Sequence, residues 1–191
     1  MTVGLFGGSF DPIHHGHLLV AQAVRERLGL DQVRFVPARE QPLKRGQHQA
    51  SALQRARMVA LAIEGAPEFA LERAELERPA PSYTVDTLRG LRAREPDRSF
   101  ALLIGADAAR DLPAWREPEA LPALARLILF ARPGAMPPAL PWPVEIVEVP
   151  AIDLSATEIR RRVAAGLSIR YWVPDRVADF IHSERLYLPD G

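Results

Sequence analysis

Residues 4–24 read GLFGGSFDPIHHGHLLVAQAV and join an apolar run to a segment with helical spacing. The run Val3–Phe6 is typical of a buried strand, and two consecutive glycines follow it. From His17 onward, apolar residues recur every three or four positions as far as Gly29, a residue suited to the end of a helix. We therefore predict a strand, a glycine-rich turn and a helix, with three histidines at the turn.

The rest of the chain repeats this alternation of strands and helices. Further strands are predicted at residues 32–37, 69–74, 99–105, 126–131 and 144–149, and further helices at 52–63, 84–94, 118–125, 156–165 and 174–183. This order predicts an α/β fold: a Rossmann-like, doubly wound parallel sheet in a single domain, residues 1–191, with C-terminal helices. Ligands of such sheets bind at the carboxyl ends of the strands, where the strand order reverses.

Composition narrows the class of protein. The chain has 191 residues, a net charge of zero and no cysteine. The balanced charge argues against a nucleic-acid partner, and the lack of cysteine excludes disulfides, thiol catalysis and cysteine-ligated zinc. The start of the chain does not resemble a signal peptide, and no apolar stretch approaches 18 residues. We expect a soluble, cytoplasmic protein without a membrane partner, and we leave open whether it forms a homo-oligomer.

The glycine and histidine junction suits a phosphate group. Gly7 and Gly8 let the backbone approach a ligand closely, and the start of the following helix offers free N–H groups. The side chains of His14 and His17 can both point toward a ligand at this junction and stabilise charge on its phosphoryl group. His15 is interpreted as a residue without a part in binding. A tight turn and a histidine metal site are the alternatives. Neither the P-loop pattern nor G-x-G-x-x-G is present.

The string GGSFDPIHHGH, residues 7–17, resembles the signature of the nucleotidyltransferase superfamily, in which H-x-G-H follows a G-x-F-D-P turn. Three further segments resemble motifs of the bacterial nicotinate-nucleotide adenylyltransferases. They are PSYTVDTL at 81–88, Gly-Ala-Asp at 105–107 followed by Trp115, and LSATEIR at 154–160. The resemblance covers nearly the whole chain, with the motifs in family order.

The resemblance implies that the adenylyl group of ATP is transferred to nicotinate mononucleotide, giving nicotinate adenine dinucleotide and pyrophosphate in NAD biosynthesis. It implies catalytic contacts from His14 and His17. The ATP-binding residues that it implies are Gly8, Ser9, Phe10, His14, His17, Gly105, Ser155, Thr157 and Arg160. Those implied for nicotinate mononucleotide are Lys44, Thr84, Asp107 and Trp115. Mg²⁺ is expected on the ATP phosphates and not in a protein metal site.

One position departs from the family pattern. Leu43 stands where the family usually has histidine before the lysine, here Lys44, and Arg39 or Arg45 are candidates to compensate. Simpler structural roles also remain open, since Ser155 can be only a helix cap and Trp115 only a core aromatic. Among functions, the alternatives are nicotinamide mononucleotide or phosphopantetheine as the acceptor, a nucleotide-binding regulator without catalysis, and a fragment of a tRNA synthetase.

Overall fold

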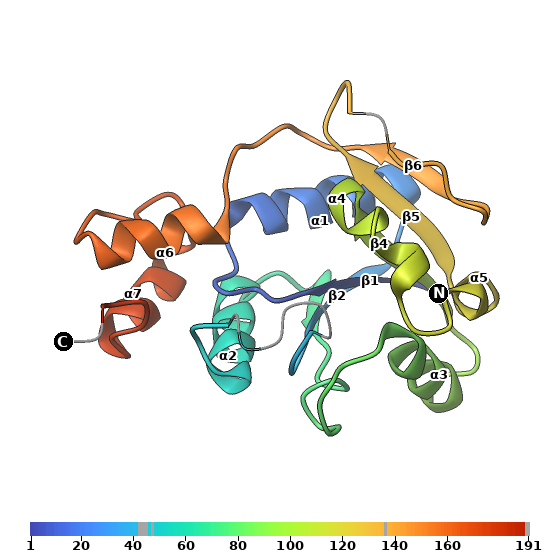
Figure 1. Cartoon of the computed structure of the whole chain (residues 1–191), viewed down its shortest axis with the longest axis horizontal. Helices are drawn as coiled ribbons and strands as arrows, with labels where there is room; N and C mark the ends of the chain where they lie inside the picture. Colours follow the sequence, from blue (N-terminus) through green and yellow to red (C-terminus); the bar gives the residue numbers. More distant parts are fainter. Residues whose placement is uncertain (42–45, 47, 136, 190–191) are drawn as a thin grey trace.

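The computed structural model describes residues 1–41, 46, 48–135 and 137–189, and a parallel sheet lies at its centre (Figure 1). The sheet order is β3-β2-β1-β4-β5-β6, and every neighbouring pair is parallel. The strands within the described residues are β1 Thr2–Gly8, β2 Gln32–Pro37, β3 Phe69–Leu71, β4 Ser99–Gly105, β5 Arg126–Ala131 and β6 Glu145–Glu148. The order reverses between β1 and β4, so a ligand site is expected where these two strands end. The predicted fold class is confirmed.

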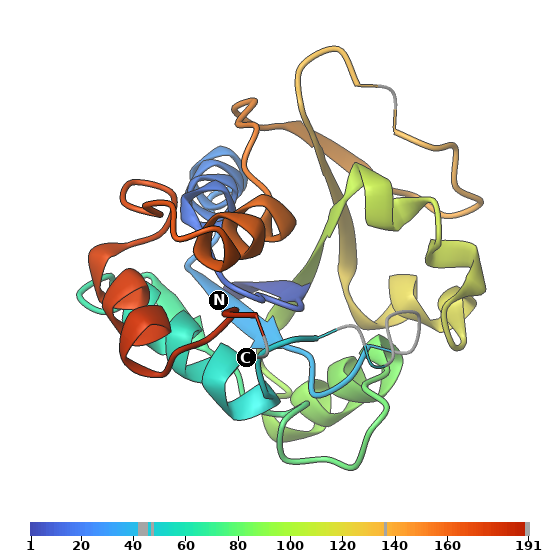
Figure 2. The ribbon, with the colours of Figure 1, turned by 60° about the vertical axis from the view of Figure 1, so that its left-hand side comes forward.

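Helices cover both faces of this sheet. The helices of the described chain are α1 His15–Leu28, α2 Ala52–Ala62, α3 Thr84–Arg94, α4 Ala106–Ala109, α5 Leu121–Leu124, α6 Ala156–Ala164 and α7 Asp175–Ser183, with 3₁₀ turns η2 Leu112–Ala114 and η3 Pro118–Ala120. Helices α1, α2, α6 and α7 share one hydrophobic cluster, and α3, α4 and α5 share the other. Figure 2 shows these two groups on opposite sides of the sheet. None of the helices in the described residues is long and apolar enough to cross a membrane.

The middle residues of the central strands β1 and β4 are apolar because both faces of these strands are buried. Along β1, Phe6 belongs to the cluster beneath α1, whereas its neighbour Leu5 belongs to the cluster beneath α3. Along β4, Leu103 and Leu102 divide in the same way. Because the strand side chains are used up in the two hydrophobic clusters, a ligand can reach only the main chain at the ends of the strands.

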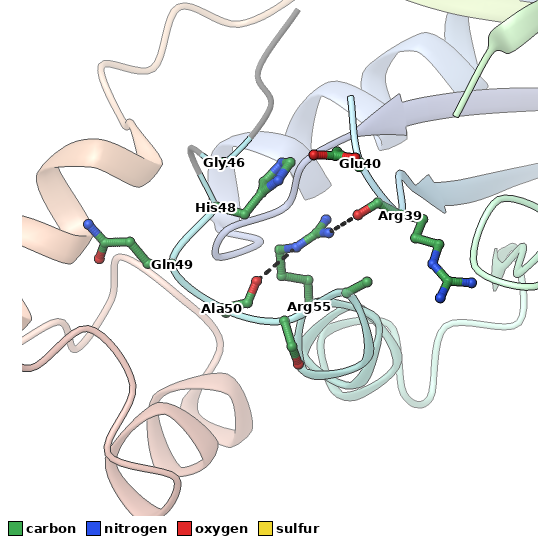
Figure 3. A pocket seen from close by; sticks show the side chains of 9 residues that line it. Arg39, Glu40, Gly46, His48, Gln49, Ala50 and Arg55 are labelled. Atoms are coloured by element: carbon green, nitrogen blue, oxygen red, sulfur yellow. Dashed lines mark hydrogen bonds between the residues drawn. The ribbon is translucent and has the colours of Figure 1, made fainter. Parts of the chain in front are cut away.

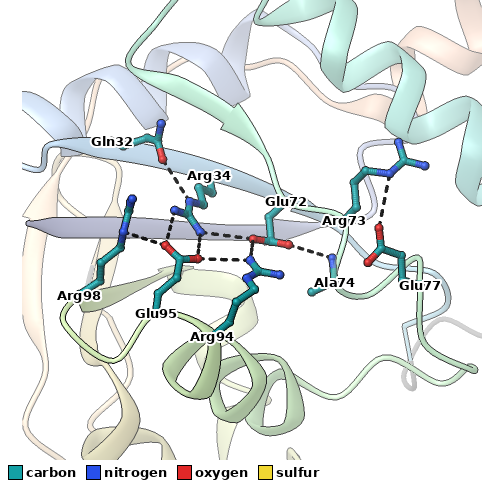
Figure 4. A network of polar contacts seen from close by, with 9 residues as sticks. All are labelled: Gln32, Arg34, Glu72, Arg73, Ala74, Glu77, Arg94, Glu95 and Arg98. Carbon is teal, nitrogen blue, oxygen red and sulfur yellow. Dashed lines mark hydrogen bonds and ion pairs between the residues drawn. The ribbon is translucent and has the colours of Figure 1, made fainter.

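A network of ion pairs fixes β2 against the end of α3 (Figure 4). Arg34, a charged residue within β2, donates to both carboxylate oxygens of Glu95 at 2.7 and 2.8 Å. Glu95 also pairs with Arg98 at 2.7 Å, and Arg34 reaches Glu72 at 3.4 Å. The hydrogen bond from Arg34 lowers the pKa of Glu95 to about 2.

Some elements differ from their predicted bounds. The strand predicted at 69–74 ends at Leu71, because the Glu72 carboxylate accepts a hydrogen bond from the N–H of Ala74 at 3.0 Å and closes a turn. The helix predicted at 118–125 is divided into η3 and α5, and the four-residue helix α4 was not predicted. The first helix begins at His15 and not at His17, so His14 is its N-cap.

Candidate active site

The two histidines of the H-x-G-H turn lie against each other at the start of α1. The ring centroids of His14 and His17 are 3.7 Å apart and their planes differ by 24°. Nδ1 of His17 accepts a hydrogen bond from the main-chain N–H of His14 at 3.2 Å. This bond leaves Nε2 of His17 as the nitrogen that carries the proton of the neutral ring, so Nε2 is its one N–H donor.

Burial keeps both rings neutral. It lowers the pKa of His14 to about 4, with a smaller contribution from the charge of His15. The pKa of His17 is likewise held well below its usual value, first by burial and then by His14. Two stacked imidazoles cannot both be charged at small cost without an anion beside them. A phosphate group placed there supplies that anion and accepts their N–H groups.

The loop between β1 and α1 is supported from beneath by an aromatic ring. Phe10 adopts a positive φ of 49° and is buried, with its ring 5.1 Å from the ring of His17. A Cβ added at Gly8 would lie only 2.9 Å from that ring, so the end of β1 needs a glycine. The buried Phe10 side chain therefore shapes the loop, and only its main chain is left for a ligand. Ser9, next to it, donates to Gln41 at 2.9 Å and lies 3.2 Å from His48 Nε2.

The start of α6 lies beside this turn, although it follows about 140 residues later (Figure 2). The Ser155 hydroxyl accepts from the N–H of Glu158 at 3.2 Å and so caps the helix as predicted. Arg160 donates to the main-chain oxygen of Asp11 at 2.7 Å and to the hydroxyl of Thr157 at 3.3 Å. The structure thus brings the predicted residues of the β1–α1 turn and of α6 together.

Three of the residues predicted for the acceptor, Thr84, Asp107 and Trp115, lie within the described chain, and Gly105, predicted for ATP, lies two residues before Asp107. Gly105 ends β4 and precedes α4, whose first turn holds Asp107 with its side chain 96% exposed and paired with Arg110 at 3.1 Å. Thr84 begins α3, and Trp115 follows η2, where it packs partly buried against the cluster beneath α3. The Arg116 guanidinium lies 4.7 Å above the ring of Tyr83, which connects the segment of Trp115 with the start of α3.

The predictions for Leu43, Lys44 and Arg45 lie outside the described residues. Arg39, the other candidate to compensate for Leu43, donates to the main-chain oxygens of Leu76 and Arg78 at 3.3 and 3.2 Å. Its guanidinium therefore has a structural use already.

Sequence reasoning missed Arg55, a residue only 1% exposed that joins the loop after β1 to both ends of the loop between β2 and α2 (Figure 3). Its guanidinium donates to the main-chain oxygens of Ser9 at 2.6 Å and of Ala38 at 2.7 Å. Further bonds reach the oxygens of Arg39 at 3.1 Å and Ala50 at 3.3 Å, and a hollow of about 410 Å³ opens beside them. On the sequence, Arg55 is one charge on an amphipathic helix, and nothing there marks it as buried.

Comparison with known proteins agrees with this geometry. Residues 5–162 match the cytidylyltransferase-like family. A Thermus thermophilus relative with the name "Probable nicotinate-nucleotide adenylyltransferase" is 49% identical over 187 residues, covering 98% of this chain and 100% of the relative. A relative of that name from Roseiflexus is 44% identical and is aligned over 97% of both chains. The solved structure of Plasmodium falciparum nicotinic acid mononucleotide adenylyltransferase complexed with NaAD shares the fold, with a TM-score of 0.78, 20% identity and 97% coverage of both chains.

The chain therefore belongs to the cytidylyltransferase-like family, a class of nucleotidyltransferases. Its full-length relatives place it, more narrowly, among the nicotinate-nucleotide adenylyltransferases. The resemblance found in the sequence is confirmed.

Proposed function

We propose that this chain transfers the adenylyl group of ATP to nicotinate mononucleotide and releases pyrophosphate, as a step of NAD biosynthesis. One observation carries the proposal. The bond of 2.7 Å from Arg160 to the main-chain oxygen of Asp11 docks the capped start of α6 on the turn of His14 and His17. Two helix N-termini, two imidazoles and a guanidinium then share one end of the sheet, which is suited to a triphosphate.

In the proposed reaction, an oxygen of the 5′-phosphate of nicotinate mononucleotide attacks the α-phosphorus of ATP. A new phosphorus–oxygen bond forms, the bond between the α-phosphorus and the bridging oxygen to the β-phosphorus breaks, and pyrophosphate leaves with those electrons. The nucleophile is already ionised, so the protein need not supply a general base. Its task is to align two anions and to stabilise the charge that spreads over the transferring group.

Each predicted residue has a role in this proposal. His14 and His17 donate to the transferring phosphates, and Ser155, Thr157 and Arg160 hold the β,γ end of ATP. The main chain of Gly8, Ser9, Phe10 and Gly105 borders the nucleotide. Thr84, Asp107 and Trp115 receive nicotinate mononucleotide, with the indole against the pyridine ring, and Lys44 contacts phosphate.

Nucleotidyl transfer from ATP generally uses a divalent cation, and we propose Mg²⁺ held mainly by the triphosphate oxygens. Mg²⁺ prefers oxygen ligands, and the triphosphate supplies them. When bound, the cation neutralises part of the triphosphate charge. We propose the cytoplasm as the place of action, with ATP and nicotinate mononucleotide as the partners.

The test offers the purified protein ATP and Mg²⁺ together with nicotinate mononucleotide, nicotinamide mononucleotide or phosphopantetheine in separate reactions. Pyrophosphate release and the mass of the product identify the acceptor. We expect nicotinate mononucleotide to give the highest kcat/KM. An equal or higher kcat/KM with another acceptor would contradict the assignment.

A further inference from the structure

The carboxylate of Asp11, within the turn that leads to His14, is buried and accepts three hydrogen bonds. Two come from the main-chain N–H groups of Gln49 at 2.9 Å and Ala50 at 3.2 Å, in the loop before α2. The third comes from the hydroxyl of Tyr187 at 2.7 Å, 176 residues further along the chain. One carboxylate thus joins the histidine turn to two distant segments.

Tyr187 is held firmly in place for this contact. Its side chain belongs to the core beneath α1, and the residue is only 7% exposed. The hydroxyl also lies 3.9 Å from the sulfur of Met58 in α2. Burial, with a further contribution from the Asp11 carboxylate, raises the pKa of the phenol above its usual range. The hydroxyl therefore stays protonated at any working pH, so it remains a donor to Asp11.

The main-chain oxygen of Asp11 is held as well, by the guanidinium of Arg160 at 2.7 Å. Asp11 is therefore held at its side chain by Tyr187 together with the two N–H groups of the loop before α2, and at its main chain by α6. His14 follows three residues later. A movement of Asp11 would change both where Arg160 points and where the histidine pair lies.

We propose that Tyr187 is a positioning residue for the ATP phosphates: its hydroxyl holds Asp11 so that Arg160 and the histidine pair face one triphosphate. This inference rests on the proposed function, since it takes Arg160, His14 and His17 as the phosphate contacts. Tyr187 touches neither substrate and acts through Asp11.

The test variant is Tyr187→Phe, which keeps the buried ring and removes the hydrogen bond. Loss of this donor leaves the Asp11 carboxylate held only by the loop before α2, so we expect kcat/KM for ATP to fall by several-fold to about tenfold. The KM for nicotinate mononucleotide should stay within about twofold. Tyr171→Phe is the matched control, because that ring is 77% exposed and lies against Arg170, and it should leave every constant unchanged.

A double-mutant cycle with Arg160→Ala distinguishes a positioning role of Tyr187 from a purely structural one. If Tyr187 acts by placing Arg160, the loss of kcat/KM caused by Tyr187→Phe shrinks when Arg160 is already absent. Losses that simply multiply, or a wild-type kcat/KM in Tyr187→Phe whatever its melting temperature, would overturn the proposal.

Calorimetric binding of a non-hydrolysable ATP analogue separates this inference from the choice of acceptor. We expect the Kd to rise several-fold in Tyr187→Phe and to be unchanged in Tyr171→Phe. If the wild type makes no product from nicotinate mononucleotide but the analogue shows this difference, the acceptor assignment fails and the role of Tyr187 stands. If the analogue binds both variants like the wild type, or does not bind the wild type, the role of Tyr187 is refuted.

Discussion

At the scale of single residues, the His14–His17 pair is defined by what holds it neutral. Both rings have a lowered pKa because they are buried, and the Nδ1 of His17 is occupied by the N–H of His14. The pair is therefore arranged as hydrogen-bond donors before any nucleotide arrives. A donor positioned in advance does not have to be reorganised as charge develops in the transition state.

We predict that His17→Ala lowers kcat by about 10²–10³, the usual effect of removing one such donor. The control is His15→Ala on the same turn, since the described bond of His15 is made by its main-chain N–H to Trp172 at 3.2 Å and survives the change. Steady-state kinetics and thermal melting are measured on both variants. A His17→Ala protein that turns over normally but melts early would show that His17 serves the fold.

Gly16, between the two histidines, gives a second prediction. A Cβ at this position would lie 3.0 Å from Nδ1 of His14, so Gly16→Ala should displace that ring by a few tenths of an ångström. We expect kcat to fall by several-fold to roughly tenfold, since small misplacements at a reacting centre are costly. Gly90→Ala in α3 is the control, because nothing lies within 4 Å of its Cβ, and it should stabilise the protein by up to about 1 kcal/mol. Equal kcat in both variants would contradict the crowding argument.

At the scale of elements, α6 has two uses for its first turn. Ser155 caps the helix by accepting from the N–H of Glu158, and the same end of the helix faces the proposed phosphate site. If Ser155 both caps the helix and binds ATP, its removal must lower stability and weaken ATP binding.

We predict that Ser155→Ala lowers the free energy of unfolding by about 0.5–2 kcal/mol and raises the KM for ATP. Ser51→Ala is matched to it, since Ser51 caps α2 through the N–H of Gln54 at 3.3 Å. That variant should lose similar stability without a change in the KM for ATP. Denaturant unfolding and ATP kinetics decide the matter, and a KM for ATP that is unaffected in Ser155→Ala would reduce Ser155 to a cap.

Trp115, just after η2, tests the acceptor side. If its ring stacks on pyridine, Trp115→Ala raises the KM for nicotinate mononucleotide several-fold to about tenfold and leaves that for ATP unchanged, the scale set by about 0.5–1.5 kcal/mol per aromatic pair. Trp142→Ala is the control because Trp142 is also partly buried against the cluster beneath α3 but precedes β6. Both should lose stability, and only Trp115→Ala should alter acceptor binding. A parallel rise in both KM values would place Trp115 in the core alone.

Some element bounds were predicted directly from their residues. Those of β2, β4 and β5 match the prediction because each strand is a short run of mostly buried residues. The helix α4 was missed because four residues show no period. The contacts of Arg55 and Tyr187 could not be predicted from the sequence either. Arg55 binds main-chain oxygens, which every residue has, and Tyr187 binds Asp11, which lies 176 residues away. The resemblance to family motifs supplied the predicted site residues, and the structure supplied the contacts that hold them.

At the scale of the whole molecule, the network around Glu95 links β2 to α3 and should govern unfolding in acid. The pKa of Glu95 in the folded protein is about 2, below the ordinary value of 4.5. Its contribution to stability is therefore complete above pH 4.5 and is lost as the pH falls towards 2.

We predict that Glu95→Gln lowers the free energy of unfolding by about 1–3 kcal/mol at pH 7, and that this difference from the wild type narrows between pH 4.5 and 2. Urea unfolding at several pH values measures it. Glu77→Gln is the control, because its pair with Arg73 spans 3.9 Å and its side chain is 67% exposed, so it should change little. A difference that is the same at pH 7 and pH 2.5 would contradict the assigned pKa.

The way Arg55 binds has a consequence for how this protein can vary. Its guanidinium contacts the main-chain oxygens of Ser9, Ala38, Arg39 and Ala50 and none of their side chains. Substitutions at those four positions leave the acceptors in place. An inserted or deleted residue in the same loops would move a carbonyl by several ångströms and break the clamp. The Arg55 contacts therefore constrain the length of these loops more than their amino-acid composition.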